Sequence, residues 1–294
     1  MDTLRLFDED DSGRKRPGPK KAASKPLPYS DLDLASWKDY PEVITDSLWV
    51  MENRARGNGH KFDYHGNFIP QIATQIFTRY TKTGDIVLDM FLGSGTSAIE
   101  AVNLDRRCIG VELKEELAQH VRSKIPADKL GSDIRVLQGD SASGDTVAAV
   151  RGTLADLGAE HAQLLMLHPP YADIIKFSDL PEDLSNAGST DDFLDMFEEV
   201  AQNGFDLLEP GRFAALVIGD KYAAGELVPL GFQCLDRMNK VGFKTKSIII
   251  KNIEGNEKAK GKDNNLWRYR ALAGGFYIFK HEYVMVFQKP KEGK

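Results

Sequence analysis

The sequence predicts an α/β fold in which a doubly wound parallel sheet carries the functional site. From Thr83 onward, short runs rich in β-branched residues alternate with longer segments of helical periodicity. A glycine-rich turn follows the first of these runs, and two consecutive prolines follow the fourth. Strands that alternate with helices at this spacing pair in parallel, and such sheets bind ligands at the carboxyl ends of their strands. Both turns therefore stand where a ligand site is expected.

The alternation yields seven expected strands and no internal repeat. The strands are predicted at Asp85–Asp89, Arg107–Glu112, Ile134–Gln138, Gln163–Leu167, Arg212–Ile218, Lys246–Ile250 and Tyr283–Phe287. Helices are predicted at Ser97–Leu104, after the second strand through Lys124, at Asp191–Leu208 and at about Leu227–Val241.

The region before Thr83 divides into a polar tail and an ordered cap. Residues 1–28 are rich in Asp, Lys, Pro and Ser and nearly devoid of apolar side chains, so they cannot bury enough surface to offset their ordering entropy. We expect them to form a disordered tail. The stretch Leu34–Asn53 contains Trp37 and Trp49, which predicts a cap packed on the main domain. Residues 29–294 are then expected to form a single domain.

The composition is that of an ordinary globular protein, with 41% hydrophobic and 28% charged residues. No apolar run is long enough to span a membrane, and the N-terminus does not resemble a signal peptide. Cys108 and Cys234 lie far apart, without the spacing of a disulfide framework or a zinc site. We expect a cytoplasmic protein with no metal and no membrane partner.

The net charge of −6 argues weakly against a nucleic-acid partner, yet the basic residues cluster. Phosphate contacts are made by local patches, so whole-chain charge is a poor guide. The clusters comprise Arg14, Lys15, Arg16, Lys20, Lys21 and Lys25, and later Lys251, Lys258, Lys260, Lys262, Arg268 and Arg270. Because lysine-rich runs are more often a solvated surface, charge alone does not decide the partner.

The first strand ends at Asp89 and runs into a turn that contains Gly93 and Gly95. Glycines at a strand-to-helix turn let the backbone approach a ligand closely. The second strand ends in Glu112, which is placed to accept hydrogen bonds from ribose hydroxyls. A nicotinamide dinucleotide also fits the glycine spacing taken alone. A phosphate-binding P-loop is excluded, because no Gly-Lys-Ser/Thr follows.

The fourth strand leads into His168-Pro169-Pro170-Tyr171. The two prolines fix the backbone and remove its donors, while their carbonyls stay free to accept hydrogen bonds from a ligand. An aromatic amine is a poor nucleophile, because its lone pair is delocalised into the ring. Acceptors such as the Pro169 carbonyl and a neutral His168 imidazole can hold the amine hydrogens. The ring of Tyr171 can stack on a flat aromatic ligand.

Together the two motifs resemble those of amino-methylating DNA methyltransferases, in the permuted order with the cofactor loop first. The resemblance covers roughly residues 49–287. It implies a class I, Rossmann-like methyltransferase fold whose mostly parallel seven-stranded sheet has an antiparallel last strand. It also implies S-adenosyl-L-methionine as cofactor, bound by Phe68, Pro70, Asp89, Phe91, Gly93, Ser94, Gly95, Thr96, Glu112, Asp140 and Ser141. The sequence departs from the family at His168, where Asp, Asn or Ser is usual.

The resemblance names His168, Pro169, Pro170 and Tyr171 as the catalytic residues and the exocyclic amino group of a flipped base as the target. His168 has a structural alternative, in which Pro169 alone accepts the hydrogen bond. The missing Asp or Asn favours the 4-amino group of cytosine, with the 6-amino group of adenine as the alternative. An RNA base and a protein glutamine are further alternatives, as is a cofactor-binding module without activity.

The insertion at 252–280 is too long for a hairpin turn and combines basic, amide and aromatic residues. Such side chains suit phosphate contact, base reading and stacking. The candidate DNA-binding residues are Lys258, Lys260, Lys262, Asn265, Trp267, Arg268 and Arg270. The loop Ala172–Gly188 is expected to close over the flipped base. Double-stranded DNA is thus the expected partner, and a homodimer and a cognate restriction endonuclease are left open.

Overall fold

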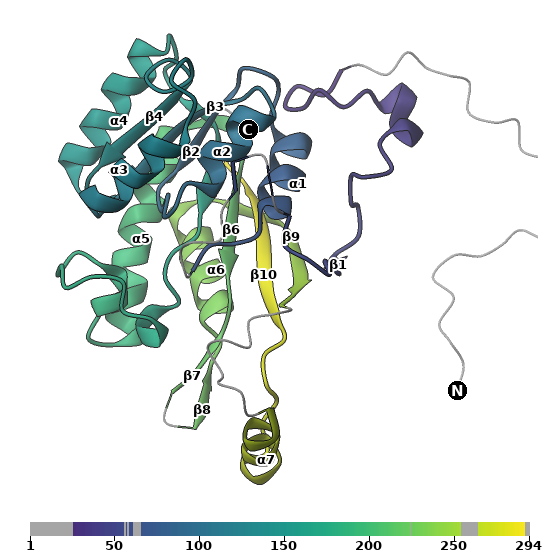
Figure 1. Cartoon of the computed structure of the whole chain (residues 1–294), viewed down its shortest axis with the longest axis vertical. Coiled ribbons are helices and arrows are strands. Elements are labelled where there is room, and N and C mark those ends of the chain that lie inside the picture. The colour runs from purple at the N-terminus through teal and green to yellow at the C-terminus, as the bar shows by residue number, and fades with distance from the viewer. Residues whose placement is uncertain are drawn as a thin grey trace, which may run out of the picture.

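The expected strands assemble into one sheet of eight strands, in the order β1-β9-β10-β6-β5-β2-β3-β4 (Figure 1). The computed structural model describes residues 26–55, 57, 59–60, 66–223, 225–253 and 264–291. The strands of this sheet are β1 (Leu48–Trp49), β2 (Ile86–Asp89), β3 (Arg107–Glu112), β4 (Ile134–Gln138), β5 (Ala162–Leu167), β6 (Leu208–Ile218), β9 (Lys244–Asn252) and β10 (His281–Gln288). All seven predicted strands are present, and the two-residue β1 adds an eighth at the edge.

The pairing directions follow the methyltransferase pattern that the motifs implied. The pairs from β6 through β5, β2 and β3 to β4 are parallel, and β1 is parallel to β9. Only β10 runs antiparallel to both of its neighbours, β6 and β9. The predicted antiparallel last strand is therefore confirmed. The carboxyl ends of β2, β3, β5 and β6 consequently meet at one edge of the sheet, which we call the carboxyl edge.

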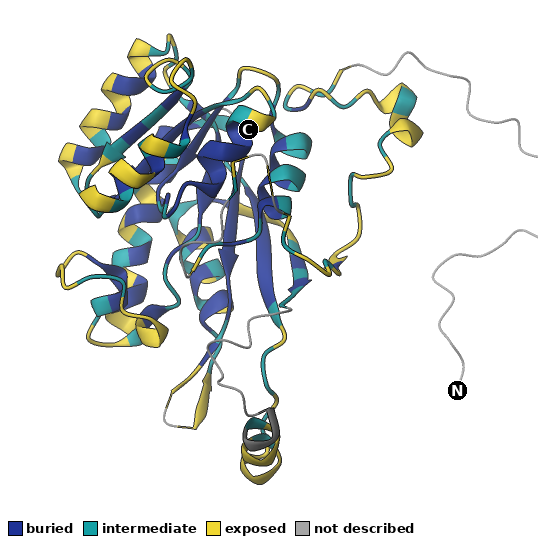
Figure 2. Cartoon of the chain, viewed as in Figure 1, coloured by how far each residue is buried: buried dark blue, intermediate teal, exposed yellow. Residues whose placement is uncertain are grey.

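Helices cover both faces of the sheet, as a doubly wound fold requires. They are α1 (Pro70–Tyr80), α2 (Thr96–Asn103), α3 (Glu115–Lys124), α4 (Gly144–Asp156), α5 (Thr190–Leu207) and α6 (Leu230–Val241). The first three pack their apolar stripes on one face of the strands, and α4, α5 and α6 pack on the other. The strands between them are almost wholly buried (Figure 2). Short 3-10 helices span Leu34–Asp39, Ala172–Ile174 and Leu184–Asn186.

A small hairpin and an additional helix extend from the carboxyl edge. The hairpin consists of β7 (Lys221–Ala223) and β8 (Glu226–Val228), and α7 (Asn264–Gly274) occupies the insertion between β9 and β10 (Figure 1). The prediction that Leu227 and Val228 begin a helix is wrong. They belong to β8, and α6 begins only after Pro229, which stands at its N-cap position.

The described segment before β1 contacts the domain at several points. Residues 1–25 of the predicted tail lie outside the described residues. Trp49 is buried in the core, where its strand pairs with β9, as expected of a cap that packs on the domain. Trp37, in the same predicted stretch, is 65% exposed. Asp31 pairs with Arg106, which fixes this segment to the turn before β3.

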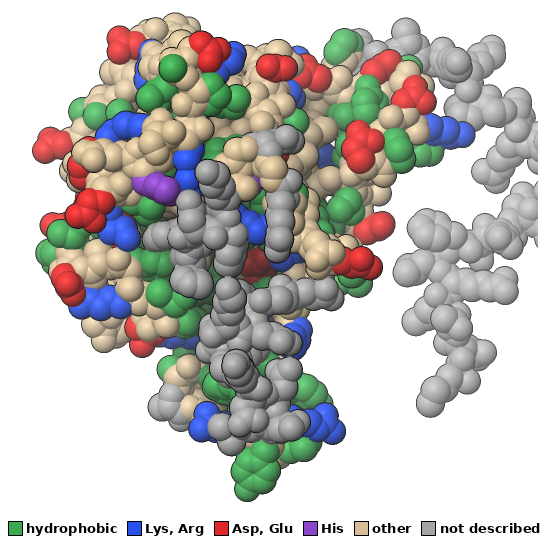
Figure 3. Space-filling view, viewed as in Figure 1, with side chains coloured by type: hydrophobic (Ala, Val, Ile, Leu, Met, Phe, Trp, Pro, Cys, Tyr) green, Lys and Arg blue, Asp and Glu red, His purple; other side chains and the backbone are tan. Residues whose placement is uncertain are grey.

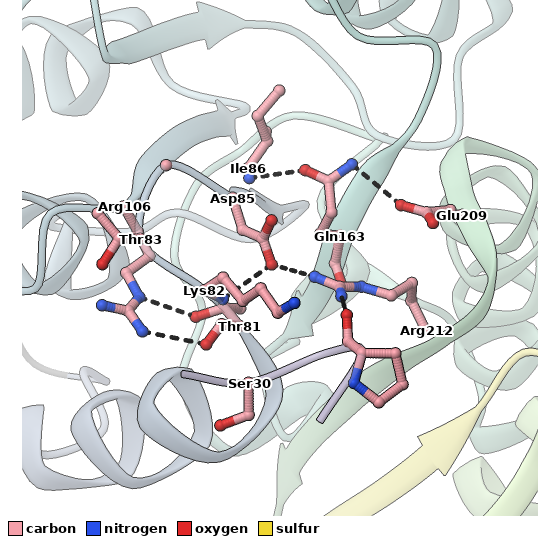
Figure 4. Close-up of polar contacts among 12 residues, drawn as sticks. Ser30, Thr81, Lys82, Thr83, Asp85, Ile86, Arg106, Gln163, Glu209 and Arg212 are labelled. Atoms are coloured by element: carbon pink, nitrogen blue, oxygen red, sulfur yellow. Dashed lines mark hydrogen bonds and ion pairs between the residues drawn. The ribbon is translucent and has the colours of Figure 1, made fainter. Parts of the chain in front are cut away.

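A buried ion pair closes the opposite, amino edge of the sheet. Asp85, just before β2, pairs with Arg212 of β6 (Figure 4). The Arg212 guanidinium also donates to the backbone carbonyls of Gln163 and Pro28, at 3.0 and 3.3 Å. These bonds link β2, β5, β6 and the start of the described chain. The amino edge is thus held by structural contacts, while the motifs lie at the other edge.

Candidate active site

The two motifs meet because β2 and β5 are neighbours in the sheet. The backbone N–H of Met90, just after β2, donates to the carbonyl of Met166 in β5 at 3.3 Å. The ring of Phe68 lies edge-on to the His168 imidazole, with 5.2 Å between ring centroids. A residue predicted to hold the cofactor thus contacts one predicted to be catalytic.

Two buried carboxylates shape the turn after β2. Asp89 is 1% exposed and accepts a hydrogen bond from the backbone N–H of Phe91 at 2.9 Å. Glu112, at the end of β3, accepts from the backbone N–H of Gly93 at 2.9 Å and from that of Lys114 at 3.0 Å. The carboxylate of Glu112 therefore fixes the glycine turn as well as facing the carboxyl edge.

Burial makes both carboxylates unusually basic. It raises the pKa of Asp89 to about 6, against the lowering effect of the nearby Ser97 hydroxyl and of the hydrogen bond from the Phe91 N–H. Burial also raises the pKa of Glu112, against hydrogen bonds from Lys114 and Gly93. A ligand that brings positive charge to this turn would favour the ionised forms. The ammonium and sulfonium groups of S-adenosylmethionine carry such charge, so these two carboxylates fit that cofactor.

Gly95 must be glycine for two reasons. Its φ of +89° lies in the left-handed region, and a Cβ atom there would stand 2.7 Å from Cγ1 of Val121 in α3. It forms the N-cap of α2, whose first residue, Thr96, is buried. Ser94 is also buried, and its hydroxyl accepts a hydrogen bond from the side chain of Asn67. The turn is therefore packed against neighbouring elements on several sides.

The remaining predicted cofactor residues surround this turn. Pro70 is the first residue of α1 and is buried, and Phe91 is half-buried. Ser141, after β4, donates from its hydroxyl to the carbonyl of Met90 at 2.6 Å. One carboxylate oxygen of Asp140 accepts from the backbone N–H of Ala142 at 2.9 Å. All eleven predicted cofactor residues thus lie on the turns of this edge or on the segment that enters α1.

His168 stays neutral over most of the pH range because it is poorly solvated. Burial lowers the pKa of the imidazole to about 4. Its ring lies between those of Phe68 and Tyr171, with a centroid separation of 5.8 Å to the latter. Pro169 is buried and Pro170 half-buried. A neutral imidazole beside the Pro169 carbonyl offers two acceptors to a ligand amine.

Tyr171 has a partner that the sequence reasoning missed. Its hydroxyl donates to Oε2 of Glu282 at 3.0 Å, and Oε1 of Glu282 lies 3.2 Å from the ammonium nitrogen of Lys251. Burial, followed by the charge of Glu282 and this hydrogen bond, raises the pKa of Tyr171 well above its ordinary value. The sequence signal is a charged residue next to each of two apolar runs, with Lys251 after Ile248–Ile250 and Glu282 before Tyr283–Phe287.

The loop after the catalytic motif is tied to other elements around the site. Ala172 has a φ of +48°, a strained value for a residue with a Cβ. Asp173 forms an ion pair with Lys221 at the start of β7. Farther along, the carbonyl of Phe177 accepts from the Lys114 side chain at 3.1 Å. The loop thus extends from β5 across to the end of β3.

The structure describes only part of the predicted DNA-binding set. Lys258, Lys260 and Lys262 lie outside the described residues, as does the side chain of Asn265 in α7. Arg268 and Arg270 are exposed, and the Arg270 guanidinium lies 5.3 Å from the ring centroid of Trp267.

Helix α7 is joined to the β7–β8 hairpin by aromatic contacts. Tyr222 of β7 stacks on Phe279 at 4.8 Å and contacts Phe276 at 5.0 Å. Its hydroxyl donates to the Tyr277 carbonyl at 3.1 Å. We call the hairpin and residues 264–280 together the protrusion. Basic and apolar side chains gather over it in Figure 3, and Tyr277 is 89% exposed.

Two classes of site find no support in the described part of the chain. No group of three or more His, Cys, Asp or Glu side chains is arranged to hold a metal there. None of its helices combines the length and apolar character needed to traverse a bilayer. Both cysteines are buried and unpaired.

Solved structures similar to this chain include several methyltransferases at low sequence identity. TrmN from Thermus thermophilus is 17% identical, with a TM-score of 0.45, and the match covers 76% of this chain and 50% of that protein. A methyltransferase from Pyrococcus furiosus is 16% identical, also with a TM-score of 0.45, over 78% and 88% of the two chains. The fold assignment above stands on the strand order and pairing of this chain itself.

Sequence relatives include restriction-modification methyltransferases. Type II methyltransferase M2.DpnII of Streptococcus pneumoniae is 39% identical over 97 residues, which is 33% of this chain and 34% of the relative. Type II methyltransferase M.SmaI of Serratia marcescens is 44% identical over 94 residues, or 30% and 32%. A match to type II methyltransferase M.MjaII of Methanocaldococcus jannaschii covers 9% of that protein. The chain thus spans about a third or less of the length of these relatives.

A family model described as DNA methylase, of the N6/N4 methyltransferase type, matches residues 12–123. This segment contains the glycine turn and Glu112, and it ends before the His168 motif. The cofactor of this family is S-adenosylmethionine, as the motifs implied. The family match and the curated relatives support the assignment of this chain to the amino-methylating DNA methyltransferase family, which its sequence motifs predicted.

Proposed function

We propose that this chain is a DNA methyltransferase that uses S-adenosylmethionine to methylate the exocyclic amino group of a base flipped out of duplex DNA. The observation that carries the proposal is the meeting of the two motifs at the carboxyl edge. The turn after β2 and the motif after β5 follow neighbouring strands, and the segment before α1 contacts both, since Asn67 donates to Ser94 and Phe68 packs against His168. A cofactor on one loop and a base on the other would then face each other.

The cofactor would be held by the turn after β2. Asp89 and Glu112 offer carboxylates, and Asp140 retains an oxygen beyond the one that bonds Ala142. When bound there, S-adenosylmethionine supplies an electrophilic methyl group. Gly95 holds this turn close against α3, because a side chain there would collide with Val121.

The base would be held by the motif after β5. The Pro169 carbonyl and the neutral His168 imidazole accept hydrogen bonds from the target amine, which directs its lone pair toward the methyl carbon. Tyr171 stacks on the base and fixes its plane. The amine nitrogen bonds to the methyl carbon as the carbon–sulfur bond breaks, and the amine then loses a proton to solvent or to His168. Positioning and preorganised hydrogen bonds supply the acceleration, without a covalent enzyme intermediate.

For the target base we propose the 4-amino group of cytosine. The family tends to combine a carboxylate or amide at the first catalytic position with adenine and a hydroxyl with cytosine. His168 is held neutral by its lowered pKa, so it presents no positive charge to the base at neutral pH. It also lacks the carboxylate or amide that tends to accompany adenine. The 6-amino group of adenine is the alternative.

We further propose that the DNA lies across the protrusion and the carboxyl edge. The supporting features are the exposed Arg268 and Arg270, the exposed aromatic residues of the protrusion, and the loop that runs from Tyr171 toward Lys114. Arginine side chains can bind phosphates, and aromatic side chains can stack on unpaired bases. A homodimer and a partner endonuclease remain predictions from the sequence.

The test is methyl transfer from labelled cofactor to genomic duplex DNA that lacks base methylation, followed by mass spectrometry of the nucleosides. We expect 4-methylcytosine as the product, with duplex DNA outcompeting RNA as substrate. If 6-methyladenine is the sole product, the base assignment is wrong and the enzyme class stands. Transfer only to RNA or protein, or to nothing, would reject a DNA methyltransferase. Tyr171→Ala, which removes the stacking ring, serves as the inactive control.

A further inference from the structure

Lys251 and Glu282 form a buried charged pair directly behind the catalytic tyrosine. Lys251 is 5% exposed and Glu282 8% exposed. They face each other across the antiparallel pair of β9 and β10, where their Cα atoms are direct partners. One Glu282 oxygen lies 3.2 Å from the Lys251 ammonium, and the other accepts the Tyr171 hydroxyl at 3.0 Å. We call Tyr171, Glu282 and Lys251 the tyrosine relay.

The ring of Tyr171 is also restricted on its other sides. A Cβ atom at position 219 would lie 3.0 Å from Cε2 of the ring, so Gly219 at the end of β6 leaves just enough room. His168 packs edge-on against the same ring at 5.8 Å. With its hydroxyl fixed by Glu282, the ring has one orientation available. A stacking surface that is preset in this way loses little freedom when a base arrives.

We propose that Glu282 and Lys251 are positioning residues for methyl transfer, which act through Tyr171 by fixing its ring and raising its electron density. This inference rests on the proposed function. A phenol that donates to a carboxylate is more electron-rich than a free phenol, because hydrogen-bonded groups polarise one another in a medium of low dielectric. Lys251 pairs with the second oxygen of Glu282.

An electron-rich tyrosine ring would stabilise the charge that develops during methyl transfer. Positive charge develops on the target amine as its nitrogen bonds to the methyl carbon, and it persists until the amine loses its proton. An aromatic face beside a cation is stabilising, and more so when the ring is electron-rich. The effect is larger in the transition state than in the ground state, so it raises kcat rather than affinity.

A role in stability alone does not explain the buried pair of Lys251 and Glu282. Burying two charges is costly, and apolar residues of similar volume usually serve stability as well or better. The neighbours of these residues along the strands are Ile248, Ile249 and Ile250 before Lys251 and the run from Tyr283 to Phe287 after Glu282. Two buried charges next to these apolar runs, one of which bonds the motif tyrosine, indicate a role in the site.

The experiment compares Tyr171→Phe, Glu282→Gln and the double variant by single-turnover methyl transfer at saturating DNA and cofactor. Glu282→Gln keeps the shape of the side chain and removes its charge. We expect each single variant to transfer about 10-fold more slowly, with cofactor and DNA affinities unchanged. The double variant should be no slower than the slower single variant, because both changes disrupt one interaction.

A matched control is available at the amino edge of the sheet. Asp85→Asn removes the charge of one partner in the buried ion pair with Arg212, far from the motifs (Figure 4). It should lower the thermal midpoint, as Glu282→Gln does, and leave the transfer rate at the wild-type value. Slowing by both variants would show that lost stability, and not the tyrosine relay, governs the rate.

Two outcomes separate this inference from the proposed function. If the wild-type protein methylates DNA and Glu282→Gln matches its rate, the tyrosine relay has no role in transfer. Losses that multiply in the double variant would likewise overturn the coupling between Glu282 and Tyr171. If the wild-type protein transfers no methyl group to DNA, the proposed function fails first, and this inference fails with it.

Discussion

His168 occupies a position that the family usually fills with Asp, Asn or Ser, and its environment explains how an imidazole can serve there. Burial lowers its pKa to about 4, so the ring is a neutral acceptor at physiological pH. An unperturbed histidine would be partly protonated near pH 6.5 and would then only donate. Packing against Phe68 and Tyr171 therefore determines what this residue can do chemically.

A pH profile follows from this lowered pKa. At saturating cofactor, which keeps the titration of Asp89 out of the readout, we expect the single-turnover rate to stay level from pH 8 to about 5.5. His168→Asn, which restores a residue type common in the family, should give a parallel profile. A wild-type rate that falls below pH 6.5 while the His168→Asn rate stays level would contradict the prediction.

The lowered pKa of His168 should also make the protein less stable as the pH falls. The folded pKa lies below that of the unfolded chain, so the folded state binds fewer protons, and stability is fully present above pH 6.5. It is lost as the pH falls from 6.5 toward 4. Relative to His168→Asn, wild-type protein should lose on the order of 2 kcal/mol of unfolding free energy between pH 7 and 4.5. Urea denaturation at both pH values measures this difference.

At the residue scale, the sequence predicted what lies in contiguous motifs and missed what depends on pairing. Asp89, Glu112 and His168 could be found because each stands at the end of a strand or directly after one. Glu282 and Lys251 could not be assigned to the site, because they meet Tyr171 only through the register of β9 and β10. That register depends on long-range packing, which no local pattern encodes.

At the element scale, prediction succeeded where packing and periodicity agree. The core strands were placed within a few residues, because strands buried on both faces are continuous apolar runs. Helix α4 and the β7–β8 hairpin were not predicted. The hairpin has three-residue strands with exposed side chains, which leaves too short a pattern to recognise. Helix α7 lies in the 252–280 insertion, for which the sequence predicts a DNA-reading surface and no helix.

The turn between β2 and α2 offers a test with an internal comparison. Gly95→Ala would combine left-handed strain with a 2.7 Å contact to the Val121 side chain. Gly84→Ala would add only strain, since its φ is +80° and open space surrounds the new methyl group. We expect about 1 kcal/mol of lost stability for Gly84→Ala and about 2–4 kcal/mol for Gly95→Ala.

Gly95→Ala and Gly84→Ala should differ more in cofactor affinity than in unfolding free energy. Gly95→Ala displaces the turn that bears Gly93 and Ser94, so binding should weaken at least 10-fold by calorimetry, since a shift of the binding atoms loses hydrogen bonds. Gly84→Ala, at the amino edge, should bind like wild type. Equal affinities for the two variants would mean that the turn after β2 does not hold the cofactor.

At the scale of the whole molecule, the two edges of the sheet have different properties. The amino edge is closed by the Asp85–Arg212 pair and its bonds to Gln163 and Pro28. The carboxyl edge carries both motifs, the tyrosine relay and the exposed protrusion. A chain with a net charge of −6 can bind DNA only if its basic residues face the phosphates locally. The DNA-binding prediction is therefore best tested on the basic residues of the protrusion.

Arg268→Ala combined with Arg270→Ala removes two exposed cations from the protrusion. We expect DNA affinity to fall about 10-fold or more at moderate salt, and the slope of log Kd against log salt to decrease by about 2, because each arginine that meets a phosphate releases one counterion. Cofactor affinity should not change. Fluorescence anisotropy with a labelled duplex across a salt series measures both effects.

The matched control is Lys244→Ala combined with Lys246→Ala, which removes two equally exposed cations at the start of β9, away from the carboxyl edge. Net charge changes by the same amount, so a general loss of attraction would weaken both double variants alike. A local DNA surface predicts a different result: the lysine variant keeps the wild-type affinity and salt slope, and the arginine variant loses both. If the lysine variant is the weaker binder, the duplex contacts a face other than the protrusion, and the target base must reach Tyr171 by another path.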